Sequence, residues 1–83
     1  MRTRVQDTGD RNICGARIEQ KRREIGMKQK DLLTKLQIRG IDLTASGLSK
    51  IEGQLRSVND SELIAIADAL DVSVLWLLGL EKN

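Results

Sequence analysis

Apolar side chains recur along this chain three or four positions apart, and no segment shows the alternation typical of a β-strand. The spacing predicts five short helices, over residues 13–25, 28–36, 44–53, 60–70 and 74–78. Residues suited to helix ends flank these segments: Asn12, Thr44 and Ser73 as N-caps, and Gly26, Gly53 and Gly79 as stops. The predicted fold class is therefore all-α, a compact bundle of about five short helices.

The third segment, "TASGLSKIEG" at residues 44–53, has an unusual outward face. Leu48 and Ile51 are three residues apart and share the inward face. At 100° per residue, the remaining positions are small or polar: Ala45, Ser46, Gly47, Ser49, Lys50 and Gly53. Glycine inside a helix costs about 1 kcal/mol relative to alanine, so this composition needs a reason. Either the helix approaches a ligand closely, or it packs tightly against another helix through Ala45 and Gly47.

A short helix followed by a second one with a small, polar outward face is typical of a helix-turn-helix. In that motif the second helix lies in the major groove of DNA, with its N-terminal residues against base edges. Ser46 and Ser49 can each donate or accept a hydrogen bond, and Lys50 can donate to guanine O6 or N7. The pattern favours double-stranded DNA as the partner of residues 44–53.

The chain has 83 residues and a net charge of +2, with the charge unevenly distributed. Residues 1–30 hold nine Lys and Arg against four Asp and Glu, whereas residues 61–83 hold one against four. A positive side of this kind suits a polyanion, although a solvated mixture of charges would give the same counts. The expected organisation is a flexible arm at 1–11, one domain at 12–80 and a tail at 81–83.

The composition argues against an enzyme. The chain has no histidine, its single cysteine, Cys14, lies on an apolar helical stripe, and no glycine-rich phosphate loop follows a strand. Cys14 is expected to be a small core residue. We therefore expect no catalytic residue, no metal, no cofactor and no small-molecule ligand. No stretch approaches the roughly 18 apolar residues of a membrane span, and a lone cysteine fits a reducing cytosol, so a cytoplasmic protein is expected.

Three runs in order, "ARIEQKRREIGMKQKDLLTKL", "LSKIEG" and "IADALDVSVLWLLG", resemble the lambda-repressor-like (XRE-type, Cro-type) helix-turn-helix family over residues 12–80. The resemblance implies a sequence-specific DNA-binding transcription regulator, expected to be a repressor. The positions that match the family's base-contacting residues are Ala45, Ser46 and Lys50, with Ser49 as a secondary candidate. The resemblance also implies a salt bridge between Arg22 in the first helix and Glu52 in the third.

The resemblance extends to contacts with the DNA backbone. Gln29 matches a residue that contacts a phosphate and braces the recognition helix, Thr44 matches the N-cap of that helix, and Arg56 matches a loop that contacts phosphate. Arg39 is added because it lies in a connection that could reach a phosphate, and Lys28 because it stands at the start of the second helix.

The sequence departs from the family pattern at four places. About five extra residues stand between Leu36 and Thr44, and these either lengthen the second helix or loop out. Lys28 occupies the position of a usual Ser or Thr cap, which puts that cap in doubt. Leu33 replaces a usual alanine, which could open the helix pair slightly. Asp71 stands where glycine commonly adopts a left-handed conformation, which aspartate tolerates at some cost.

The C-terminal run "VSVLWLLGL" is apolar nearly all round. Val74, Leu77 and Leu78 share a face suited to the core, and the other side carries Leu75, Trp76 and Leu80. These three predict the interface of a homodimer bound to a palindromic operator, unless Trp76 folds back over the core. Two other functions stay open: a protein-interaction module on the same fold, and the DNA-binding antitoxin of a toxin–antitoxin pair.

Overall fold

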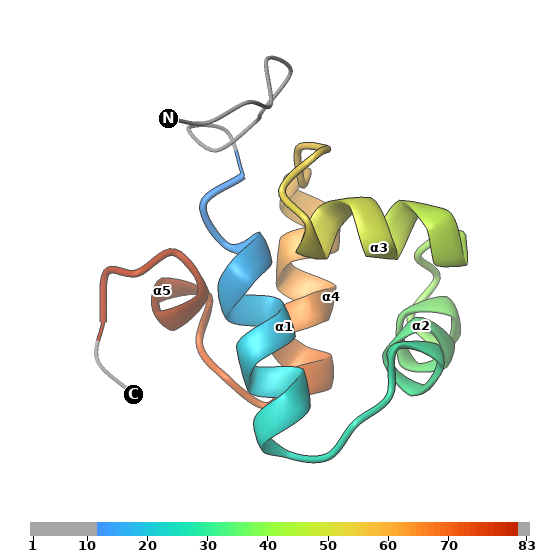
Figure 1. The fold of residues 1–83 in the computed structure, drawn as a ribbon, viewed down its shortest axis with the longest axis horizontal. Helices are drawn as coiled ribbons and strands as arrows, with labels where there is room; N and C mark the ends of the chain where they lie inside the picture. Colours follow the sequence, from blue (N-terminus) through green and yellow to red (C-terminus); the bar gives the residue numbers. More distant parts are fainter. Residues whose placement is uncertain (1–11, 82–83) are drawn as a thin grey trace.

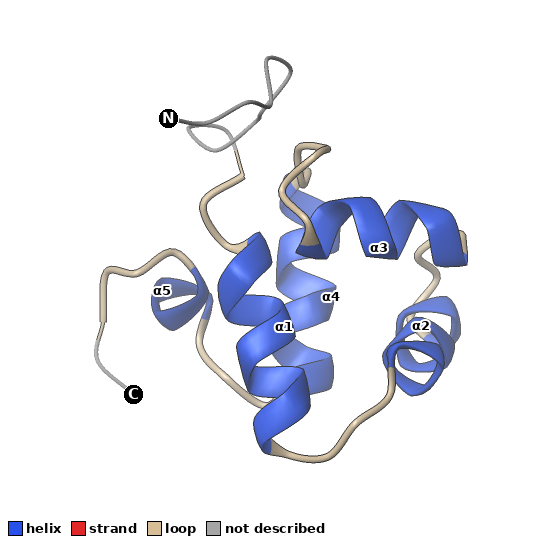
Figure 2. Cartoon of the chain, viewed as in Figure 1, coloured by secondary structure: helices blue, strands red, loops and turns tan. Residues whose placement is uncertain are grey.

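A computed structural model describes residues 12–81, so the predicted arm at 1–11 and most of the predicted tail lie outside the described residues. This part of the chain forms five α-helices and contains no strand, which confirms the all-α prediction (Figures 1 and 2). The helices are α1 (Gly15–Glu24), α2 (Gln29–Ile38), α3 (Ala45–Glu52), α4 (Asp60–Leu70) and α5 (Val74–Leu77).

The helices are arranged around the pair α1 and α4, which lie side by side at the centre (Figure 1). α3 crosses one end of this pair and packs on α1, while α2 packs on both α3 and α4. α5 lies on the side away from α2 and packs on α4. The result is a compact helical globule in which α3 is held by α1 and α2 and leaves its remaining surface exposed.

The core is aliphatic, as a chain without phenylalanine or tyrosine requires. Each of the five helices contributes at least one side chain that is buried: Ile18, Leu32, Leu36, Leu48, Ile51, Ile66, Leu70 and Leu77. Cys14 is also buried, which confirms it as a core residue, and burial raises the pKa of its thiol. Leu33 is only partly buried, because it lines the groove between α2 and α3.

The N-termini of the helices confirm most of the predicted caps. Thr44 accepts from the Gly47 amide and Ser73 from the Trp76 amide, and Asn59, which was not predicted as a cap, caps α4 in the same way. Asn12 does accept from the first turn of α1, at the Gly15 amide, but the helix begins at Gly15 and not at Ile13. At Lys28, the Asp31 carboxylate accepts the backbone N–H, and the lysine side chain makes no cap.

All five helices end in a left-handed residue whose N–H, like that of the residue after it, bonds back to the last turn. Glycine supplies this conformation at Gly26, Gly40 and Gly79. Asp71 adopts it at the end of α4, with φ of 58°, as its position in the sequence suggested. α3 ends before Gly53 as predicted, but Gly53 has φ of −82° and the left-handed residue is Gln54, with φ of 61°.

The extra residues between the second and third helices are divided between a longer helix and a turn. α2 continues two residues beyond the predicted end, to Ile38, and Gly40 at φ of 83° reverses the chain. The remaining residues up to Thr44 belong to no helix or turn, and they place Leu43 in the core and Ile41 partly against it. The connection is therefore anchored by apolar side chains.

The structure corrects the role predicted for Trp76. Its side chain is only 4% exposed, because it folds back onto α1, where the Arg17 Cζ lies 4.3 Å from the ring centroid. Lys21 also lies over the ring, and Arg17 Nε donates to the Trp76 carbonyl at 2.6 Å. Trp76 is thus a core residue and not a surface for a second copy. Leu75 and Leu80 remain exposed, at 49% and 73%.

Candidate nucleic-acid interface

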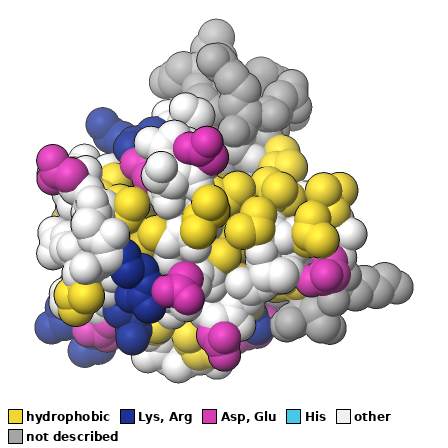
Figure 3. Space-filling view, turned by 180° about the vertical axis from the view of Figure 1, so that it is seen from behind, with side chains coloured by type: hydrophobic (Ala, Val, Ile, Leu, Met, Phe, Trp, Pro, Cys, Tyr) yellow, Lys and Arg dark blue, Asp and Glu magenta, His cyan; other side chains and the backbone are white. Residues whose placement is uncertain are grey.

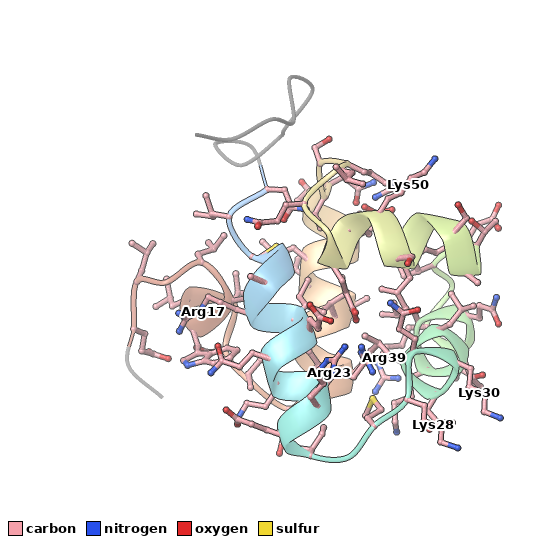
Figure 4. All side chains as sticks on the ribbon, in the orientation of Figure 1. Arg17, Arg23, Lys28, Lys30, Arg39 and Lys50 are labelled. Carbon is pink, nitrogen blue, oxygen red and sulfur yellow. The ribbon has the colours of Figure 1, made fainter. Side chains whose placement is uncertain are left out.

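The outward face of α3 has the composition that the sequence predicted. Ala45, Ser46, Ser49 and Lys50 are all exposed, whereas Leu48 and Ile51 are fully buried beneath them. Lys50 projects from α3 away from the rest of the bundle (Figure 4). The structure therefore brings the four predicted base-contacting residues together on one exposed helical face.

The structure explains the glycine at position 47 by a local contact that neither interpretation of the sequence had considered. A Cβ at this position would lie 2.9 Å from Leu43 Cδ1 and 3.3 Å from Thr44 Oγ1. The glycine thus leaves room for the buried leucine that precedes the cap. Ala45 is exposed, so tight helix packing through Ala45 and Gly47 is not found. The small size of Ser46 and Ser49 is not required by packing either, because both side chains face solvent.

A buried network holds α3 in place from beneath. Arg22 Nε and Nη2 donate to the two oxygens of Glu52 at 2.8 and 3.0 Å, so the ion pair expected between the first and third helices is present. Gln29 Nε2 donates to Glu52 Oε1 at 3.0 Å, and Arg22 Nη1 donates to the Met27 carbonyl. The hydrogen bonds to Glu52 raise the pKa of Arg22. One carboxylate on α3 is thereby tied to both α1 and α2, which gives Gln29 its bracing position.

A shallow groove of about 250 Å³ separates the N-terminal halves of α2 and α3. Its lining comprises Gln29, Lys30, Leu33, Ala45 and Leu48. Lys30 was not singled out in the sequence, yet its exposed side chain stands at the edge of the surface formed by α3. The helical spacing from Gln29 could have indicated it, since residue 30 lies only 100° further round α2.

The unpaired positive charge of the described residues lies on α2, on α3 and on the residue before α2. Five of the cations in residues 12–81 are paired with a carboxylate: Lys21, Arg22, Arg23, Arg39 and Arg56. Arg17 is engaged by Trp76. The lysines without an ion pair in this part of the chain are Lys28, Lys30, Lys35 and Lys50. Lys30 lines the α2–α3 groove and Lys28 directly precedes α2, and Figure 4 shows both pointing outward from the start of that helix.

Two arginines predicted to contact phosphate instead form ion pairs with carboxylates of the same chain. Arg39 Nε donates to Asp68 of α4 at 2.6 Å and its Nη1 to the Lys35 carbonyl, so its side chain is directed toward α4. Arg56 donates to both oxygens of Glu62, at 3.0 and 2.7 Å. The contact of Arg39 could not be foreseen, because Asp68 is 29 residues away from it in the sequence, whereas Glu62 is only six residues from Arg56.

Other surfaces of the molecule differ in character. The face seen from behind gathers hydrophobic side chains (Figure 3). A separate, wider groove runs between α4 and the turn after α2, lined by Arg39, Ile41, Ser61, Ile64, Ala65 and Asp68. None of the helices in residues 12–81 is long and apolar enough to cross a membrane.

Compared with known proteins, the chain matches no family model, no curated protein and no solved structure. The resemblance to the lambda-repressor-like family therefore rests on the sequence motifs. The geometry of α2, α3 and the cations around them is the basis for the function considered next.

Proposed function

We propose that this chain is a sequence-specific double-stranded DNA-binding protein of the transcription-regulator class, with α2 and α3 acting as a helix-turn-helix. The observation that carries the proposal is the exposed face of α3. It presents small, polar side chains and Lys50, and the buried Glu52 network fixes it to two other helices. A rigid helix with such a face suits the major groove, where base edges offer donors, acceptors and methyl groups.

Each exposed residue of α3 has a role in this proposal. Lys50 donates to guanine O6 or N7, Ser46 and Ser49 exchange hydrogen bonds with base edges or phosphate, and the Ala45 methyl meets a thymine methyl. The N-terminus of α3 and the nearby Lys28 and Lys30 attract phosphate. Gln29 uses one N–H on Glu52, which leaves its second N–H to donate to a phosphate of the DNA backbone. Repression follows from occupancy, because a bound protein blocks the same DNA to others.

The test begins with selection of bound sequences from a random DNA pool, followed by the affinity of the selected duplex at several salt concentrations. Binding should weaken steeply with salt, in proportion to the phosphates contacted. Lys50→Ala should cost about 1–3 kcal/mol on the selected site and blur the preference at one base pair. Lys35→Ala is the matched control, because Lys35 is exposed and unpaired but lies 200° round α2 from Leu33, which faces α3.

The phosphate contacts give a different signature. Lys30→Ala should weaken binding to all sequences alike and reduce the salt slope by about one. Arg56→Ala is not a clean test, because it also leaves Glu62 without its partner. If Lys50→Ala and Ser46→Ala leave both the selected sequence and the affinity unchanged, α3 is not the recognition helix.

A further inference from the structure

Asn12 is a buried polar residue that contacts the end of α3, although the two are far apart in the sequence. Its side chain is 1% exposed, and its Nδ2 donates to the Ile51 carbonyl at 2.9 Å and to the Arg56 carbonyl at 2.7 Å. Its Oδ1 accepts from the Gly15 amide at 2.9 Å. The amide group thus joins the start of α1, the last turn of α3 and the loop that follows. A helix cap alone would have needed only the bond to Gly15.

Gly15 brings the backbones of α1 and α3 into direct contact at the same place. A Cβ on Gly15 would lie 2.2 Å from the Ile51 carbonyl oxygen, which is backbone and cannot turn aside. Any larger residue would therefore push the last turn of α3 away from α1. Because Gly15 has ordinary helical geometry, its lack of a side chain serves this approach and not an unusual backbone conformation.

The left-handed Gln54 completes this attachment. Its Nε2 donates to the Asn12 carbonyl at 3.1 Å, so the residue that ends α3 is fastened to the residue that precedes α1. Glu52 meanwhile binds Arg22, seven residues after Gly15. Along an α-helix seven residues span about 10 Å. α1 therefore holds the last turn of α3 at two separate points, which fixes its angle as well as its distance.

We propose that Asn12 and Gly15 are positioning residues for α3: they set the angle and depth at which its exposed face is presented. This rests on the proposed function, since a shift of α3 matters to DNA binding only if α3 enters the groove. Displacing α3 from α1 moves Ser46, Ser49 and Lys50 together relative to the lysines at the start of α2 that we propose to attract phosphate. Base contacts and backbone contacts then cannot be made at the same time, so sequence preference is lost before general affinity for DNA.

The experiment compares Gly15→Ala and Asn12→Asp with wild type. Asn12→Asp keeps the size of the side chain but places carboxylate oxygen against two carbonyls. Leu77→Ala is the control, since it removes core packing in α5, which packs on α4. Residual dipolar couplings of backbone amides give the orientation of α3 relative to α1 and α4 without DNA. Affinities for the selected duplex and an unrelated duplex are measured well below each melting temperature.

Gly15→Ala and Asn12→Asp are expected to change the orientation of α3 and to lower the ratio of specific to non-specific affinity about tenfold or more, the loss of one good base contact. Leu77→Ala should melt earlier with neither change. An unchanged α3 orientation in both variants, or a specificity ratio equal to that of Leu77→Ala, would overturn the proposal. If wild type binds no duplex at all, the proposed function fails, and the dipolar couplings alone still decide whether the two residues position α3.

Discussion

At the level of single residues, two of the helices end in a left-handed residue that is not glycine. Gln54 and Asp71 adopt left-handed conformations without being glycine, with φ of 61° and 58°. Such a conformation costs a residue with a side chain roughly 1–2 kcal/mol. At Gln54 the side chain compensates by its bond to Asn12. Asp71 has no such hydrogen bond among those found in residues 12–81, and its carboxylate stands at the negative end of the α4 dipole.

Asp71→Gly is therefore expected to stabilise the fold. Glycine adopts φ of 58° without strain, although it also loses more chain entropy on folding, so the net gain should be about 0.5–1 kcal/mol. For a domain of this size, 1 kcal/mol corresponds to a rise in melting temperature of roughly 4–8 °C. Asp71→Asn separates the two causes, since it removes the charge and keeps the side chain. A thermal melt of Asp71→Gly at or below wild type would contradict this account.

The same two residues show what sequence can predict at this scale. The expectation that Asp71 is left-handed came from the resemblance to the helix-turn-helix family, in which glycine commonly stands at this position. Gln54 could not be identified, because Gly53 beside it is the better left-handed residue by composition alone. What decides between them is the bond to Asn12, which is 42 residues away in the chain. Trp76 was assigned wrongly for the same reason, since its partners Arg17 and Lys21 lie on α1.

Among the elements, α4 was the best predicted, and its two ends agree with the sequence analysis. Asn59 and Glu62 form reciprocal cap bonds at its start, a signal contained within four residues. The loop before α4 is fastened to it by Arg56, which donates to both oxygens of Glu62. Glu62 thus serves as a helix cap and an ion-pair partner at once. The connection after α2 was harder to predict, because "QIRGIDL" contains no signal that fixes where the helix ends before Gly40.

The contact between Arg56 and Glu62 predicts how stability depends on pH. The hydrogen bonds from Arg56 hold the pKa of Glu62 below its ordinary value of 4.5 in the folded protein. A carboxyl whose pKa is lowered by folding contributes stability that is present above the unfolded pKa and lost as the pH falls through the folded pKa. The free energy of unfolding should therefore decrease as the pH is lowered beneath about 4.5. Glu62→Gln should be less stable than wild type at pH 7 and should lose less on acidification.

Denaturant titrations at pH 7 and at several values down to pH 3 measure this difference. Glu24→Gln is a useful comparison, because the pKa of Glu24 is also lowered, first by its hydrogen bond from Lys21, but its side chain is exposed. Solvent screening makes such a pair contribute little to stability. Equal losses of stability on acidification in wild type and Glu62→Gln would show that Glu62 does not carry the acid dependence.

For the whole molecule, the arrangement of charge and apolar surface divides the fold into distinct sides. Unpaired lysines flank α2 and α3, whereas Leu75 and Leu80 are exposed at α5, which lies on the side away from α2 (Figure 1). The charge balance of the sequence predicted only a positive side from the N-terminal part of the chain, and Arg39 and Arg56 were expected to contact phosphate. Their ion pairs with α4 leave Lys28, Lys30, Lys35 and Lys50 as the lysines without an ion pair in residues 12–81.

The exposed leucines carry the remaining prediction, that the protein is a homodimer joined near α5. Leu75 and Leu80 are linked through the backbone, because the Leu80 amide donates to the Leu75 carbonyl at 2.9 Å, so both side chains belong to one compact turn. Exposed apolar side chains grouped in this way commonly mark an interface. A two-fold dimer would place its recognition helices about 34 Å apart and would require a palindromic operator with half-sites one turn apart.

Sedimentation of wild type and of Leu75→Lys/Leu80→Lys tests the dimer. Trp76 is left unchanged, since a lysine there would put a charge into the core and confuse dissociation with unfolding. Ile64→Lys is the matched control, because it adds a charge at an exposed apolar position of α4. Wild type and the control should sediment as dimers at tens of micromolar, and the double variant as a folded monomer that binds a half-site more weakly than the dimer binds the palindrome. A monomeric wild type, or a double variant that remains a dimer, would remove these leucines as the interface.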